Sequence, residues 1–172
     1  MEIRAFLKAP KLITKAGPWK CGAVDSKNKM PKTAFPLARK RSFILGNQWW
    51  WKLDHYECGP ITGRILIAYH LEKANFIAFL AIDSAPDELA VVACLEHHYD
   101  HGSWHWHTKC ADLSQFATGA TRQRNGGIRI PPKGAYSRAR PYEMGHMEAV
   151  NRAYKAFRVA DAGGGQEQGR LL

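Results

Sequence analysis

The middle of the chain carries hydrophobic residues in short runs and in alternation with polar residues, which is the pattern of β-strands. Turn-forming residues, such as those at 72–75, separate the runs. The runs occupy residues 43–56, 64–71, 76–82, 89–99 and 104–110. Because the connections between them are short, neighbouring strands should pair antiparallel. We expect residues 42–110 to form an antiparallel β-sheet meander of about four to six strands.

Beyond Pro141 the hydrophobic spacing changes to three and four residues, which is the period of an amphipathic helix. The residues at this spacing are Met144, Met147, Val150, Tyr154 and Phe157. We expect a helix over residues 142–159 that buries this stripe against the sheet. Three consecutive glycines at 163–165 should follow its end.

Residues outside these elements lack a clear period. Prolines and glycines interrupt residues 1–41, where we expect only a short strand near residues 3–7. Residues 111–141 are predicted to be a basic loop segment, and residues 161–172 a flexible tail. The predicted fold class is α+β: one globular domain over residues 1–160, with a meander sheet, one C-terminal helix packed on it and long basic loops.

Length and composition are those of an ordinary globular protein. The chain has 172 residues, 45% of them hydrophobic, and no apolar run approaches the roughly 20 residues that a membrane helix needs. The N-terminus has no uninterrupted apolar segment of the kind found in signal peptides. The four cysteines are widely spaced and form no Cys-x-x-Cys pair, which argues against a zinc ribbon or a thioredoxin-like site. We expect a cytoplasmic protein without a membrane partner.

The distribution of charge is the strongest compositional signal, with a net charge of +10. Residues 1–60 carry 12 Lys and Arg against 4 Asp and Glu, residues 61–110 carry 3 against 6, and residues 111–172 carry 10 against 5. A slightly acidic centre is thus flanked by two basic segments, which would attract a polyanion. Nucleic acid is the expected partner. An acidic protein surface or a larger nucleoprotein complex is the alternative.

Five of the eight histidines lie within residues 97–107, in two strands that a tight turn at Gly102 would join. The predicted cross-strand pairs are His98 with His105, Glu96 with His107 and Asp100 with Ser103. Directly opposed residues share a face of a sheet. One face would therefore hold the polar residues Glu96, His98, Asp100, His105 and His107. The other face, largely apolar and aromatic, would hold Leu89, Val91, Ala93, Leu95, His97, Tyr99, Trp104, Trp106 and Thr108.

The polar face of this hairpin suggests a catalytic site with a divalent metal such as zinc or manganese. Opposed Cβ atoms lie about 4.5–5.5 Å apart, so three imidazoles could converge on one cation. The predicted metal ligands are His98, His105 and His107. On zinc, three nitrogen ligands leave a position for a water whose pKa falls toward about 7. Glu96 or Asp100 could be a fourth ligand, orient a ligand or act as general base.

Two other interpretations of the histidines remain open: surface side chains that contact phosphate, and acid–base chemistry without metal. No known motif is complete in this stretch. The His-x-His-x-Asp-His pattern of metallo-β-lactamase-like hydrolases would need histidine where Glu96 stands, so no family is assigned.

Basic and aromatic side chains are candidates for nucleic-acid contacts, because lysine and arginine bind phosphates and aromatic rings stack on bases. In a strand, Trp50 would face away from Trp49 and Trp51, so one of the three should be available as a stacking platform. The predicted contact residues are Arg39, Lys40, Arg41, Trp50, Lys52, Arg122, Arg124, Arg129, Lys133, Arg138 and Arg140.

The sequence favours a basic protein that binds RNA or single-stranded DNA, and it leaves open whether the protein also cleaves phosphodiesters as a metal- or histidine-dependent nuclease. Two other functions fit the same features. One is a non-catalytic module that binds an acidic protein. The other is an enzyme that acts on a nucleotide or another small molecule in a histidine-lined pocket.

Overall fold

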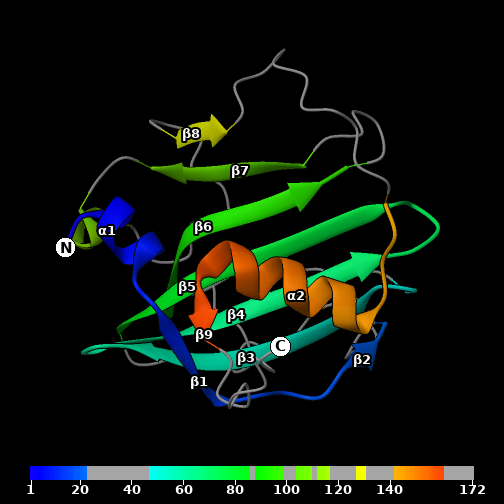
Figure 1. The fold of residues 1–172 in the computed structure, drawn as a ribbon, viewed down its shortest axis with the longest axis horizontal. Coiled ribbons are helices and arrows are strands. Elements are labelled where there is room, and N and C mark those ends of the chain that lie inside the picture. Colours follow the sequence, from blue (N-terminus) through cyan, green and yellow to red (C-terminus); the bar gives the residue numbers. More distant parts are fainter. Residues whose placement is uncertain are drawn as a thin grey trace, which may run out of the picture.

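The computed structural model joins nine strands of the described chain into one curled sheet (Figure 1). It describes residues 1–22, 47–85, 88–98, 104–109, 112–116, 127–130 and 142–160. The strands are β1 (Lys11–Lys15), β2 (Lys20–Cys21), β3 (Trp50–Cys58), β4 (Ile61–His70), β5 (Asn75–Ala85), β6 (Glu88–His97), β7 (Trp104–Lys109), β8 (Gly127–Ile130) and β9 (Val159–Ala160). The helical elements are α1 (Ile3–Lys8), α2 (His146–Phe157) and the short 3₁₀ turn η2 (Leu113–Gln115). No helix within these ranges is long and apolar enough to cross a membrane.

The order of strands across the sheet is β8-β7-β6-β5-β4-β3-β1-β9, and β2 pairs with β3. Strands β3 to β8 are antiparallel neighbours in chain order. At the opposite edge β9 runs parallel to β1, which makes the sheet mixed. The predicted meander of four to six strands is therefore too small. The supposedly irregular N-terminal segment contributes β1 and β2, and β8 forms inside the segment predicted to be a loop.

The predicted hairpin over residues 64–71 and 76–82 is confirmed as β4 and β5. Its register pairs His70 with Asn75 across a turn, and Ala74 in this turn adopts a positive φ of 44°. Most side chains from Ile65 to Tyr69 are fully buried on both faces of the sheet. Burial on both faces explains why these central strands are almost continuously hydrophobic rather than alternating.

Helix α2 packs on one face of the sheet, above β4 and β5 (Figure 1). Its buried residues are Ala149, Ala153 and Phe157, which recur every four residues. Met147 is 77% exposed, so its predicted place in the buried stripe is wrong. The two alanines have no bulky side chain, which allows the helix backbone to lie close to the sheet.

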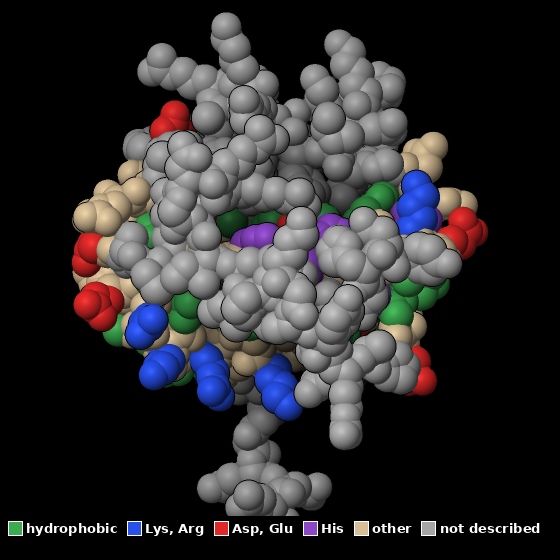
Figure 2. Space-filling model, turned by 90° about the horizontal axis from the view of Figure 1, so that it is seen from above, with side chains coloured by type: hydrophobic (Ala, Val, Ile, Leu, Met, Phe, Trp, Pro, Cys, Tyr) green, Lys and Arg blue, Asp and Glu red, His purple; other side chains and the backbone are tan. Residues whose placement is uncertain are grey.

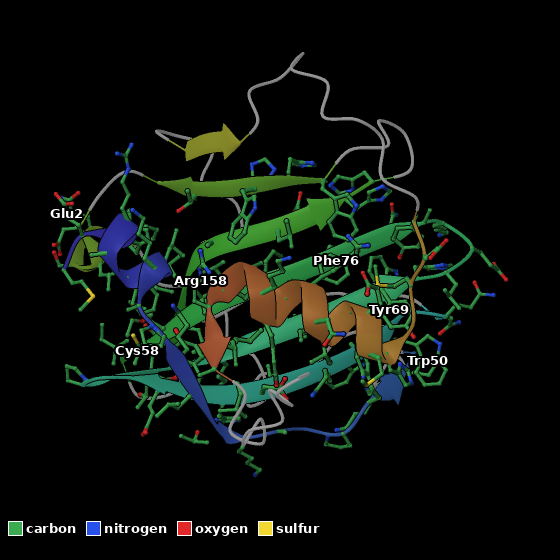
Figure 3. All side chains as sticks on the ribbon, in the orientation of Figure 1. Glu2, Trp50, Cys58, Tyr69, Phe76 and Arg158 are labelled. Atoms are coloured by element: carbon green, nitrogen blue, oxygen red, sulfur yellow. The ribbon has the colours of Figure 1, made fainter. Side chains whose placement is uncertain are left out.

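A buried polar cluster attaches α2 to β3. The carboxylate of Asp54 is inaccessible to solvent and accepts hydrogen bonds from the Tyr154 hydroxyl at 3.0 Å and from the Gly17 amide at 2.9 Å. The ammonium of Lys52 lies 3.0 Å from the same carboxylate. Figure 3 shows Tyr69 at the opposite end of the helix, where its hydroxyl lies 2.9 Å from Nδ1 of His146. Both ends of α2 are therefore fixed to the sheet.

The N-terminal segment differs from its predicted short strand, because residues 3–8 form helix α1. Ile3 and Phe6 are three positions apart and both are buried, so they lie on one side of this helix. The Lys11 ammonium donates hydrogen bonds to the carbonyls of Phe6 at 2.8 Å and Ala9 at 2.9 Å. This side chain stabilises the C-terminal end of α1, where backbone carbonyls lack helical partners.

Candidate functional site

Strands β6 and β7 bring the polar residues of the histidine-rich stretch onto one face of the sheet. Their register pairs Glu96 with His105 and Cys94 with His107. The predicted register, which paired Glu96 with His107, is wrong by two residues, because the observed pairing is centred between positions 100 and 101 instead of between 101 and 102. A shift of two residues preserves the face on which each side chain lies. The predicted grouping of Glu96, His105 and His107 on one face is therefore observed despite the register error.

One oxygen of Glu96 is the centre of this cluster. Its Oε2 lies 2.9 Å from Nε2 of His98, 3.4 Å from Nε2 of His107 and 3.5 Å from Nε2 of His105. The other oxygen, Oε1, accepts a hydrogen bond from the Cys94 thiol at 3.2 Å. We call these five residues, Cys94, Glu96, His98, His105 and His107, the Glu96 cluster.

Solvent access differs sharply within the Glu96 cluster. The side chains of Glu96 and His105 are 1% and 3% exposed, whereas those of His98 and His107 are 22% and 33% exposed. A buried carboxylate is costly unless it is paired or binds a metal. In the view onto the β8 edge, histidine side chains gather between hydrophobic ones (Figure 2). A ligand from solvent would approach the buried carboxylate beside His98 and His107.

Three members of the cluster could hold a metal ion. The donor atoms of Glu96, His105 and His107 all lie within 4.8 Å of one another. A carboxylate with two imidazoles is a ligand set of catalytic zinc enzymes and of non-haem iron enzymes. This set leaves coordination positions for water or substrate, so it suits catalysis better than a purely structural role.

The opposite face of β6 and β7 points toward α2. Leu95, Trp104 and Trp106 lie on this face, as predicted, and pack against the core beneath the helix. Leu89 and Val91 lie with Cys94 instead, on the face of the Glu96 cluster, so their predicted position is wrong. The physical reason is a β-bulge, an extra residue that reverses the alternation of side chains along the strand.

His97, between two members of the cluster in sequence, belongs to the helix-facing side. Its Nδ1 lies 2.8 Å from the carbonyl oxygen of Ala74, and its ring contacts the rings of Trp104 and Tyr142. Burial lowers the pKa of His97 and so favours its neutral form. His97 is therefore a packed interior histidine.

Two predicted nucleic-acid contacts, Trp50 and Lys52, have described side chains. Lys52 is buried and paired with Asp54, a position poorly suited to contact with a phosphate. Trp50 is half-buried on the side that α2 covers. Arg129 lies opposite His107 in the β7–β8 register, but its side chain is not described. The other predicted site residues lie outside the described residues: Arg39, Lys40, Arg41, Asp100, Arg122, Arg124, Lys133, Arg138 and Arg140.

The sequence prediction missed Cys94, which was not among the predicted site residues. The sequence could have indicated the contact between Cys94 and Glu96, because residues two positions apart lie on the same face of a regular strand. Glu96 was not among the three predicted metal ligands; it was expected to be a fourth ligand, to orient a ligand or to act as general base. In the structure Glu96 is the residue that all three imidazoles contact.

Comparison with known proteins gives no functional assignment. No protein-family model matches the chain, and neither the curated proteins nor the solved structures include a significant match. Any assignment therefore depends on the geometry of the Glu96 cluster and on the charge of the chain.

Proposed function

We propose that the protein is a zinc-dependent hydrolase that acts on phosphodiesters of nucleic acid, with Glu96, His105 and His107 as the metal ligands. The spacing of the donor atoms supports this proposal. Two ligands bound about 2.0–2.1 Å from a tetrahedral zinc ion are roughly 3.3–3.4 Å apart. The Glu96 oxygen lies 3.4 Å from the nitrogen of His107 and 3.5 Å from that of His105.

His98 has a different role in this proposal from the ligand role predicted for it. Its Nε2 lies 2.9 Å from the Glu96 oxygen, which is the distance of a direct hydrogen bond. A hydrogen bond to a ligating carboxylate fixes the orientation of that ligand. Because His98 is partly exposed, it can also exchange a proton with solvent. We therefore assign His98 to positioning Glu96 and to proton transfer at the rim of the site.

The buried and the exposed residues of the Glu96 cluster have different roles in the proposed reaction. Bound zinc would supply a water of lowered pKa as nucleophile. Buried Glu96 and His105 would hold the ion out of bulk solvent, and His107, at 33% exposure, would lie on the side that substrate approaches. The Cys94 thiol hydrogen-bonds the second oxygen of Glu96 and would keep the carboxylate from rotating.

The charge of the chain supports a nucleic-acid substrate. A net charge of +10 attracts the phosphate backbone through long-range electrostatics. Trp49 adds an aromatic ring on the face of the Glu96 cluster, where it is half-buried and meets the His70 ring edge-on. Stacking on such a ring tolerates any base, and it needs unpaired bases. RNA or single-stranded DNA is therefore the proposed substrate.

Cleavage of end-labelled RNA and single-stranded DNA tests this proposal. We expect cleavage by the zinc-loaded wild type, loss of cleavage with a chelator and recovery when zinc is restored. His107→Asn should lower the rate by at least about 100-fold, because it removes a ligand. His55→Asn is the matched control, since His55 is also a half-buried strand histidine but lies outside the cluster. Cleavage that survives the chelator, equal losses in both variants, or absence of cleavage by the zinc-loaded protein would contradict the proposal.

A further inference from the structure

A pocket of about 510 Å³ lies between α2 and the strands β6 and β7. Helix α2 packs over β4 and β5, and β7 lies beyond it toward the sheet edge (Figure 1). Leu95, Trp104 and Trp106 project from the strands and form an apolar, aromatic surface in this pocket. These side chains alternate with the Glu96 cluster along β6 and β7, so the pocket and the cluster lie on opposite faces of the sheet.

The helix lines this pocket with a polar stripe. Glu148, Asn151, Arg152 and Lys155 face it at spacings of three and four residues, beside the buried stripe that packs on the sheet. Arg152 forms an ion pair with Glu148, and its guanidinium lies 4.4 Å from the centre of the Trp104 ring. No described acidic side chain forms a salt bridge with Lys155, which is exposed. The positive charge of Lys155 is thus not balanced by a described acidic side chain at the pocket, and it favours an anionic ligand.

The indole nitrogen of Trp104 is a second unusual feature of the pocket. It is shielded from solvent, and no group among the described residues accepts its hydrogen bond. Most buried donors have an acceptor, so an exception needs an explanation. An acceptor atom on a ligand would supply one once the side chains that shield this nitrogen move aside on binding.

We propose that this pocket binds an aromatic base that carries a phosphate, with a nucleoside monophosphate as the simplest ligand. The base would displace the Arg152 guanidinium from the Trp104 ring and pack against the indoles, and an acceptor atom of the base would receive the Trp104 N–H. The phosphate would contact Lys155, an exposed lysine of α2 that lines the pocket. The pocket volume lies within the range of about 300–1,000 Å³ that is common for small-molecule sites. This site is independent of the proposed metal centre.

Calorimetric titration with AMP, adenosine and inorganic phosphate separates the contributions of base and phosphate. The wild type should bind AMP more tightly than adenosine and should bind phosphate only weakly. Lys155→Gln should weaken AMP roughly tenfold and leave adenosine unchanged, because it removes one charge-assisted contact. Trp104→Phe keeps an aromatic ring but removes the N–H, so it should weaken AMP and adenosine to the same extent. A short oligoadenylate serves as a further ligand: if it shows the same losses while AMP does not bind, the pocket holds a base of a strand rather than a free nucleotide.

Two control variants make the test decisive. Lys8→Gln removes an exposed lysine near the end of the other helix and should leave binding unchanged. Glu96→Gln alters the metal centre and should also leave AMP binding unchanged. The proposal is overturned if neither AMP nor oligoadenylate binds at millimolar concentration. It is also overturned if Lys155→Gln has no effect, or if Glu96→Gln abolishes binding while Lys155→Gln does not.

Discussion

Replacing Lys52 with methionine should destabilise the fold instead of weakening nucleic-acid binding. The Lys52 side chain is 9% exposed, and its ammonium lies 3.0 Å from the fully buried carboxylate of Asp54. Methionine has a flexible, apolar side chain that can fill the same space, so the variant removes the charge with little loss of packing. The carboxylate would keep only its hydrogen bonds from Gly17 and Tyr154 among the described contacts.

The size of the effect follows from this loss of one ionic partner. Breaking a buried ion pair from one side costs about 3–5 kcal/mol. Because two hydrogen bonds to Asp54 remain, we expect the lower limit, about 3 kcal/mol, or a fall in Tm of roughly 6–12 °C for a chain of this length. The double variant Lys52→Met/Asp54→Asn should recover most of this loss. It removes both charges and keeps an acceptor for the two hydrogen bonds.

Urea unfolding followed by circular dichroism measures the change in free energy, and fluorescence anisotropy with labelled RNA measures binding. Lys73→Met is the matched control, because Lys73 is an exposed lysine in the β4–β5 turn and its loss should change stability by less than about 0.5 kcal/mol. Unchanged stability of Lys52→Met together with weaker RNA binding would refute the reasoning. That result would mean that Lys52 reaches solvent and contacts phosphate.

Two further predictions concern the fold. Gly63→Ala would place a Cβ atom 2.1 Å from the carbonyl oxygen of Ala81, so urea unfolding should show a loss of about 3 kcal/mol or more, and wild-type stability would contradict the β4–β5 register. Burial lowers the pKa of the Lys11 ammonium from 10.5 to about 8, so the unfolded chain binds that proton more tightly. The stability of the wild type relative to Lys11→Met should therefore rise from pH 8 to pH 10.5, and a constant difference would contradict this.

The fold could be predicted where the hydrophobic pattern is long, and not where elements are short. The runs that became β4 and β5 are continuous because both faces of these strands are buried. Helix α1 has only six residues, too few for a helical period to appear in the sequence. The two-residue strands β2 and β9 form through pairing with distant segments, so their own sequence carries no strand signal.

In the candidate site, too, the local sequence pattern predicted part of the arrangement, and contacts between distant residues determine the rest. Alternation along β6 and β7 was sufficient to place Glu96, His105 and His107 on one face. The atoms that meet depend on the register of the two strands, which alternation alone does not determine. Lys52 was predicted to contact phosphate because lysine is usually exposed, whereas the structure buries it. Its pairing with Asp54, two residues away on the same side of β3, could have been considered from the sequence.

Zinc retention by the purified protein tests the proposed centre most directly. After equilibrium dialysis against zinc and removal of excess metal, mass spectrometric elemental analysis should find about one zinc ion per wild-type chain. His105→Asn removes a buried ligand and should retain less than about a tenth of that amount. The His55→Asn control should match the wild type. If the wild type retains no more zinc than His105→Asn, the Glu96 cluster is not a zinc site.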